Sequence, residues 1–222
     1  MFACEIAHNM PRAYFVFPGV FLSMLIACLV PCPAASAQAP TAVEDPYVAP
    51  HDRALLVLAR PRQRQSSETE LRVVNQAGGC LGLLRNGWQV AVPMWPGRHM
   101  LMVVTGTAPP TVQLLEVKVS AGKTYVVKLR TRVNVKSPVD IQIVRRSDQP
   151  LEQFPQDIKA IAPFEQDLRS CTEWVSWKRS KLEAKAQAAK AKWDDADEAL
   201  RDELTVRRND GWTSAEVTGG SL

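Results

Sequence analysis

The chain has 222 residues, of which 46% are hydrophobic and 23% charged, and its formal net charge is +4. Once a leader is set aside, this length predicts one domain with an appendage rather than two full domains. The positive charge is too small to indicate a nucleic-acid-binding protein, so no nucleic-acid partner is expected. Anionic surfaces of a cell envelope are the expected counterpart.

Residues 1–37 have the organisation of an export signal peptide. Arg12 supplies the positive charge, residues 13–30 form the apolar stretch, and Ala35 and Ala37 before Gln38 give the small-residue cleavage signature. The sequence therefore predicts an exported protein, periplasmic or secreted, that begins at Gln38 after cleavage.

Two alternatives to this processing stay open. Leu25-Ile26-Ala27-Cys28 also fits the pattern after which bacterial lipoproteins are cut and lipidated, so a membrane-anchored lipoprotein is one alternative. An uncleaved anchor is the other, because the apolar run approaches the roughly 18 residues needed to span a bilayer. Since Glu5 puts a negative charge where signals carry positive ones, we expect the natural start at Met10.

Cleavage after Ala37 would leave two of the five cysteines, Cys80 and Cys171. An even pair in an oxidising compartment predicts a disulfide. Two buried, unpaired thiols are the alternative.

Residues 38–51 are rich in alanine and proline and predict a flexible spacer. A β domain is expected over residues 52–148, where apolar runs alternate with glycine and proline turns. Asn86-Gly87 predicts a tight hairpin turn, because both residues tolerate positive φ. The expected strands cover residues 54–59, 71–75, 80–85, 88–92, 99–104, 115–119, 125–135 and 139–143.

Seven or eight short strands with frequent turns predict a mainly β fold. We expect an antiparallel immunoglobulin-like or prealbumin-like sandwich, or an open barrel, followed by one long C-terminal α-helix. The strand at 125–135 has the clearest alternation, with an apolar face and a basic face. The basic face could meet anionic glycan or lipid headgroups, and a solvated face that deters aggregation is the alternative. Its residues are Lys128, Arg130, Arg132 and Lys136.

The C-terminal third changes in character. Residues 149–163 contain three prolines and predict a linker, residues 164–209 predict one charged helix, and residues 210–222 predict a flexible tail. Apolar residues recur every seven positions along the helix, with a second set between them. This seam comprises Leu168, Val175, Leu182, Ala189 and Ala196, with Ala186, Trp193 and Leu200.

The helix has a basic half over 178–192 and an acidic half over 194–203. Antiparallel pairing would match these charges, so we expect self-association or binding of an envelope protein's helix. A single solvated helix is the alternative. Trp174 and Trp177 follow Cys171 closely and are interpreted as the point where the helix docks on the β domain.

Two motifs carry a resemblance. Trp95-Pro96-Gly97-Arg98-His99 and Ala121-Gly122-Lys123-Thr124-Tyr125 resemble turns of a bacterial family of envelope β domains of unknown function, similar to PEGA and carboxypeptidase-regulatory-like sandwiches. The resemblance covers about residues 54–146. It implies a β-sandwich and no known activity, and because the family includes lipoproteins it adds some weight to the alternative of lipidation at Cys28. The matching turn residues are Pro96, Gly97, His99, Ala121, Gly122, Lys123 and Tyr125.

Catalytic and metal-binding signatures are not recognisable in the sequence. After removal of the leader only His51 and His99 remain, and a zinc site wants four closely placed ligands. We therefore expect no cofactor, no metal and no enzymatic activity, and predict an exported envelope interaction or structural module. A glycan-binding module using Trp88 and Trp95 is the alternative. A hydrolase with converging carboxylates is the less favoured one.

Overall fold

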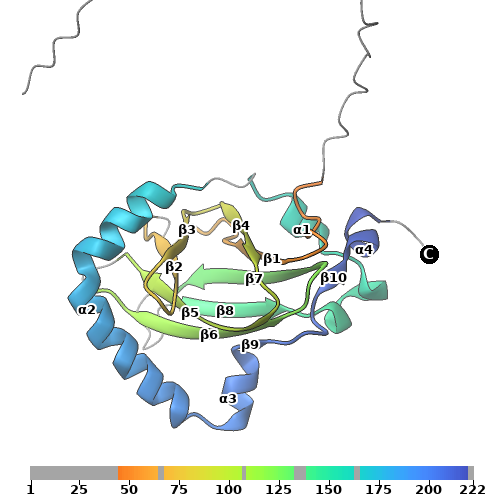
Figure 1. Ribbon diagram of the computed structural model, residues 1–222. Coiled ribbons are helices and arrows are strands. Elements are labelled where there is room, and N and C mark those ends of the chain that lie inside the picture. The colour runs from red at the N-terminus through yellow and green to blue at the C-terminus, as the bar shows by residue number, and fades with distance from the viewer. Residues whose placement is uncertain (1–44, 65–67, 107–108, 133–138, 163–165, 220–222) are drawn as a thin grey trace, which may run out of the picture. The chain divides into compact units, whose positions relative to one another are not determined.

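Two mixed β-sheets and one long helix make up most of the described chain (Figure 1). The computed structural model describes residues 45–64, 68–106, 109–132, 139–162 and 166–219. Sheet A contains β1 (Ala54–Ala59), β4 (Gln89–Met94), β7 (Lys123–Thr131), β8 (Val139–Val144) and β10 (Trp212–Thr213). Sheet B contains β2 (Leu71–Asn75), β3 (Cys80–Leu84), β5 (Gly97–Thr105), β6 (Val112–Val119) and β9 (Thr205–Val206). The expectation of a mainly β fold is confirmed.

Strand β1 has the bounds that its apolar run predicts, and all six of its residues are buried. It lies between β4 and β7, and each face contributes to a different hydrophobic cluster. Burial on both faces explains why the run is continuous rather than alternating. The pairing of β1 with β7 is parallel, as is that of β6 with β9, so the expected all-antiparallel arrangement is wrong.

The chain crosses from one sheet to the other several times. Because it passes through sheet B between β1 and β7, these two strands can run in the same direction. After β1 the chain enters sheet B, returns on β4, leaves again on β5 and returns on β7. The turn at Asn86-Gly87 is present, with Gly87 at φ +82°, but it connects β3 of sheet B to β4 of sheet A. It is thus a corner between sheets, and the hairpin predicted there is wrong.

The main core lies between the two sheets. The apolar face of β7, with Tyr125, Val127 and Leu129, meets residues of sheet B such as Leu101 and Leu115. Alternation along these strands therefore predicts their inner faces correctly.

The outer face of sheet A is covered by the segments predicted as a proline-containing linker and a flexible tail. Residues after β8 form the turns η1 (Arg146–Asp148) and η2 (Pro150–Glu152) and the short helix α1 (Gln156–Lys159), and α4 (Ser214–Thr218) is the last described element. Phe154 is 2% exposed and lies edge-on to the fully buried Trp212, with ring centres 5.4 Å apart. The described parts of the predicted linker (149–162) and of the predicted tail (210–219) are therefore largely packed, and residues 163 and 220–222 lie outside the described residues.

The described end of the predicted spacer also packs on sheet A. Tyr47 is 7% exposed, its hydroxyl donates to the carbonyl of Ile158 at 3.3 Å, and it accepts from Gln89 Nε2 at 2.6 Å. Residues 38–44 lie outside the described residues. Tyr47 and Ala49 anchor this segment, because both side chains are buried in the cluster on sheet A and the hydroxyl of Tyr47 is satisfied.

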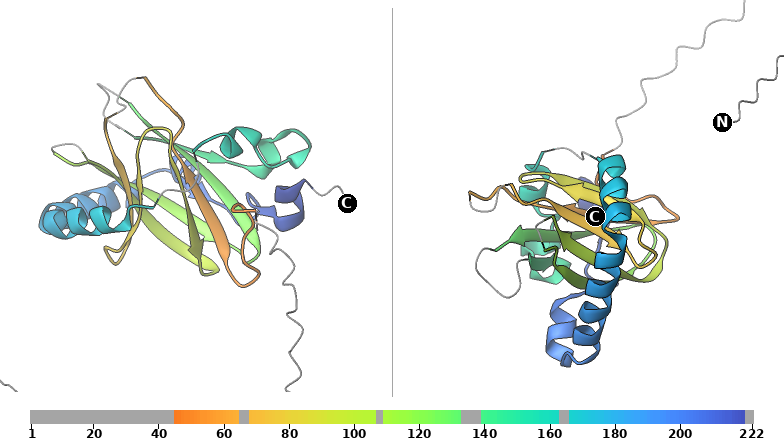
Figure 2. Two further views of the ribbon diagram at one scale, coloured as in Figure 1. Left: turned by 90° about the horizontal axis from the view of Figure 1, so that it is seen from above. Right: turned by 90° about the vertical axis from the view of Figure 1, so that its left-hand side faces the viewer.

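The outer face of sheet B is covered by α2 (Leu168–Asp194), on the opposite side from α1 and α4 (Figure 2). The helix ends well before Asn209, which corrects the predicted single helix. Asp197 starts a separate helix, α3 (Glu198–Glu203), by accepting a hydrogen bond from the backbone N–H of Leu200 at 2.8 Å. Negative charges at a helix C-terminus interact unfavourably with the helix dipole, and aspartate is a preferred N-cap residue. The helix therefore ends here and a new one begins.

Candidate functional site

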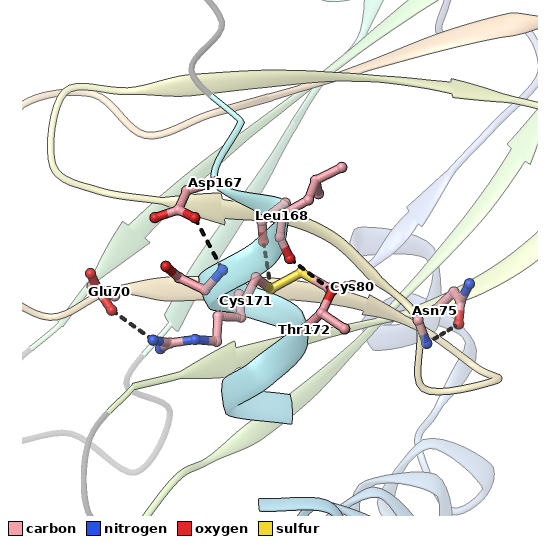
Figure 3. Close-up of a disulfide and its surroundings, with 11 residues drawn as sticks. Glu70, Asn75, Cys80, Asp167, Leu168, Cys171 and Thr172 are labelled. Atoms are coloured by element: carbon pink, nitrogen blue, oxygen red, sulfur yellow. Dashed lines mark hydrogen bonds and ion pairs between the residues drawn. A yellow bond between two sulfur atoms is a disulfide. The ribbon is translucent and has the colours of Figure 1, made fainter. Parts of the chain in front are cut away.

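Helix α2 is fastened to sheet B near its N-terminus (Figure 3). Cys171 on its first turn and Cys80 at the start of β3 lie at disulfide distance, with Cα atoms 6.0 Å apart, as the cysteine count predicts. Asp167 caps the helix by accepting a hydrogen bond from the backbone N–H of Ser170 at 3.1 Å. These contacts fix the N-terminal end of the helix against sheet B.

A buried arginine supports the same end of the helix. The guanidinium carbon of Arg72 on β2 lies 4.2 Å from the ring centre of Trp174, and the guanidinium pairs with Glu70 at 2.7 Å. Burial lowers the pKa of Arg72, and the charge of Glu70 opposes that effect. Trp174 thus docks the helix as expected, whereas Trp177 is 74% exposed and does not.

The apolar seam of α2 faces the protein's own sheet B. Val175, Leu182 and Trp193 are buried, and the first two belong to the cluster formed with Val74 and Val104. The same face was expected to pair with another helix. Val175, Leu182 and Trp193 are occupied within the chain, whereas Leu168 and Leu200 of the seam are exposed, so self-association or binding of a partner helix stays a prediction.

An exposed side of α2, next to its buried face, carries cations beside an exposed tryptophan. Lys181 and Lys185 follow Trp177 at four-residue spacing, and Lys192 falls on the same side of the helix. The amino group of Lys178 lies 3.4 Å from the ring centre of Trp177. Over its length, α2 has seven lysine and arginine residues against three acidic ones.

A cavity of about 340 Å³ lies between α2 and sheet B. Met100 and Met102 of β5 and Leu114 of β6 lie on the sheet side, and Leu182 and Ala186 lie on the helix side. Arg179, Glu183 and Lys190 line its edge. Sequence reasoning missed this site, although the continuous apolar run of β5 indicates a strand with something covering its second face.

The basic strand face is largely neutralised within the chain. Lys128 pairs with Asp157 at 2.6 Å, and Arg132 pairs with Asp140 at 2.9 Å. Arg130 is exposed, and Lys136 lies outside the described residues. The arrangement gives little support to this face as an anionic-surface patch.

The two tryptophans proposed as a sugar platform do not come together. Trp88 precedes β4 and Trp95 follows it, so about six strand residues, roughly 20 Å, separate them. Each ring has an arginine beside it: Arg85 lies 4.9 Å from the ring centre of Trp88, and Arg53 lies 4.3 Å from that of Trp95, which is 61% exposed. A joint stacking surface is therefore not formed.

The first motif of the family resemblance turns the chain from β4 into β5. Pro96 precedes the first residue of β5, Gly97, whose φ of +138° suits glycine. His99 Nε2 lies 2.8 Å from the carbonyl oxygen of Trp95 and so closes the turn. His99 therefore has a structural partner.

The second motif turns the chain from β6 into β7 in the same manner. Ala121 is exposed and Gly122 has φ +68°. The hydroxyl of Tyr125 donates to the carbonyl of Arg208 at 3.1 Å, and Lys123 Nζ lies 3.5 Å from the same oxygen. Burial raises the pKa of Tyr125, which keeps its hydroxyl protonated as a donor.

The most buried carboxylates of the described chain, those of Glu116 and Asp210, form ion pairs. Glu116 is 4% exposed and is held by Arg98, by Lys118 at 3.2 Å and by the hydroxyl of Thr205 at 3.2 Å. Burial alone would raise the pKa of Glu116, but Lys118 and Arg98 outweigh it and lower the pKa. In the described part of the chain, no three His, Cys, Asp or Glu residues cluster as metal ligands would.

The processing residues Cys28, Ala35, Ala37 and Gln38 lie outside the described residues. Among the helices that are described, none is both long and apolar enough to cross a bilayer.

No known protein family matches the chain, and a search of curated proteins finds no match to it.

Proposed function

We propose that the protein is an exported, non-enzymatic interaction module of the bacterial envelope, and that it contacts anionic lipid headgroups through the exposed face of α2. The observation that carries the proposal is an exposed tryptophan, Trp177, beside a row of lysines on a helix whose other face is fixed to the β domain. Tryptophan and lysine at such spacing are typical of helices that lie on a membrane surface.

The α2 face suits this role better than the strand face does. Lys181, Lys185 and Lys192 have no ion pairs with described residues, whereas Lys128 and Arg132 are paired. A cation near an anionic membrane contributes about 1 kcal/mol, so three lysines contribute about 3 kcal/mol before the contribution of Trp177. Because α2 is held by its inner face, it can present this row without losing contacts to the β domain.

Vesicle flotation tests the proposal. The protein is prepared with Cys28→Ser, so that a lipid anchor cannot contribute, and mixed with phosphatidylcholine vesicles with or without phosphatidylglycerol. We expect flotation with the anionic vesicles only, and its loss at about 1 M salt, where the screening length is about 3 Å.

Two variants matched in charge locate the contact. Lys181, Lys185 and Lys192 are changed to glutamine in one, and Lys128, Arg130 and Arg132 in the other. The first should abolish flotation and the second should leave most of it. Equal loss in both, or equal binding to neutral vesicles, would count against the α2 face.

Export is proposed from the leader and is tested by intact mass measurement of the processed protein, with and without reduction. A chain beginning at Gln38 is the expected product, and one beginning at a lipidated Cys28 is the anchored alternative. A chain that retains residues 1–27 would contradict both.

We also propose that the two sheets are a variant of the immunoglobulin-like or prealbumin-like sandwich, related to PEGA-like envelope domains. The glycine turns at Gly97 and Gly122, each at the start of a strand that changes sheet, support the relation. The parallel pairings are the departure from that pattern. An experimental structure of a PEGA-like envelope domain tests the relation. The same strand order in both sheets would support it, and a different order would contradict it.

A further inference from the structure

The cavity between α2 and sheet B has the size and lining of a ligand site. Its volume of about 340 Å³ falls within the range of small-molecule pockets, about 300–1,000 Å³. Met100 and Met102 on its floor are flexible side chains that adapt to the shape of an apolar ligand. Ala186 on the helix side is small, which leaves the space open.

The occupant is better a hydrocarbon chain than a peptide. The strands below the cavity, β2 and β5, each pair with a neighbour on both sides, so no backbone edge is free to bond a peptide. The backbone of α2 is satisfied within its own helix. A peptide buried there would leave amide groups without partners, at a cost of about 1–3 kcal/mol each, whereas a polymethylene chain has none.

The charge at the edge of the cavity favours an anionic head. Arg179 lines the edge and forms no ion pair with a described residue, while Lys190 is paired with Asp194 on its own helix. Glu183 is the one acidic side chain among the lining residues. An anion at Arg179 would gain a charge-assisted partner while its chain lies on the methionines.

We propose that this cavity binds a single-chain anionic amphiphile, with its hydrocarbon chain between α2 and sheet B and its head at Arg179. The site is separate from the lysine row on the exposed face of α2, and it does not depend on membrane binding.

Calorimetric titration of the delipidated Cys28→Ser protein with palmitate, below the concentration at which palmitate forms micelles, tests the proposal. Saturable binding of about one palmitate is expected, and hexadecylamine, which has the opposite charge, should bind about tenfold or more weakly. Equal binding of the two would overturn the anionic head, and no saturable binding of palmitate would overturn the site.

A pair of tryptophan substitutions on α2 gives the matched control. Ala186→Trp fills the cavity, whereas Ala188→Trp, two residues away, lies on the exposed face. Ala186→Trp should weaken palmitate binding about tenfold or more, with no change for Ala188→Trp. Equal affinities in both variants would overturn the assignment.

Photocrosslinking of the unaltered protein covers the case in which Ala186→Trp does not fold. A palmitate analogue with a photoreactive group on its chain should label peptides containing Met100, Met102 or residues 182–186. Labelling confined to other segments would overturn the proposal.

Discussion

Removing the link between Cys80 and Cys171 should destabilise the protein by several kcal/mol. The two residues are 91 positions apart, and a cross-link closing a loop of that length restricts the unfolded chain by about 4.6 kcal/mol in the chain-entropy model. With a urea dependence of about 2 kcal/mol per molar, Cys80→Ala/Cys171→Ala should lower the unfolding midpoint by about 2 M.

Urea unfolding followed by circular dichroism and tryptophan fluorescence measures this change. The unaltered protein in the presence of a reducing agent is the control, and it should match the double variant to within about 1 kcal/mol. Amide exchange should increase more in α2 than in β5, because the helix loses its fixed end while the strand keeps both neighbours. A loss below about 1 kcal/mol with an unchanged urea dependence would refute the reasoning.

Three further changes test the fold and its charges. Trp212→Ala should cost about 3–5 kcal/mol in urea unfolding because the side chain is fully buried, whereas the exposed Trp177→Ala should cost about 0.5 kcal/mol or less. Glu116→Gln should destabilise the protein at pH 7. Because its two basic neighbours lower the pKa of Glu116, that difference should shrink as the pH falls below 4.5, and a constant difference would contradict the ion pairs. Gly211→Ala should cost about 1–3 kcal/mol and lower the melting temperature, because the added Cβ would lie 2.7 Å from ring atoms of Tyr125, and an unchanged melting temperature would contradict this close contact.

Strands with strong local patterns are predictable from this sequence, and pairings between distant segments are not. The run at 54–59 and the alternation after Lys123 predict β1 and the inner face of β7, because burial selects each side chain directly. Asn86-Gly87 predicts a turn but not its partner strands, since turn chemistry fixes backbone angles and says nothing about which sheet receives the next strand.

The short strands β9 and β10 and the end of α2 could not be predicted from the sequence for a different reason. β9 and β10 have two residues each, too few to show any periodicity, and Trp212 stands among polar neighbours. The seven-residue repeat of the helix continued across Asp197, although an aspartate there forms an N-cap as readily as it continues a helix.

The candidate site was predictable only in part. The cysteine count indicates the attachment of α2, and of the two tryptophans expected at its docking end only Trp174 packs there. That its apolar seam would face sheet B could not be predicted, because a seam of this period suits either an internal sheet or a second helix equally well.

The position of Trp212 and Val217 against the first part of the chain has a consequence for biosynthesis. These residues complete the apolar cluster that covers β1, which is made some 150 residues earlier. While residues 212–217 are still inside a ribosome or a translocation channel, the outer face of sheet A therefore lacks part of its cover. A product that lacks residues 212–217 loses both side chains and keeps an uncovered apolar surface that proteases and chaperones can recognise.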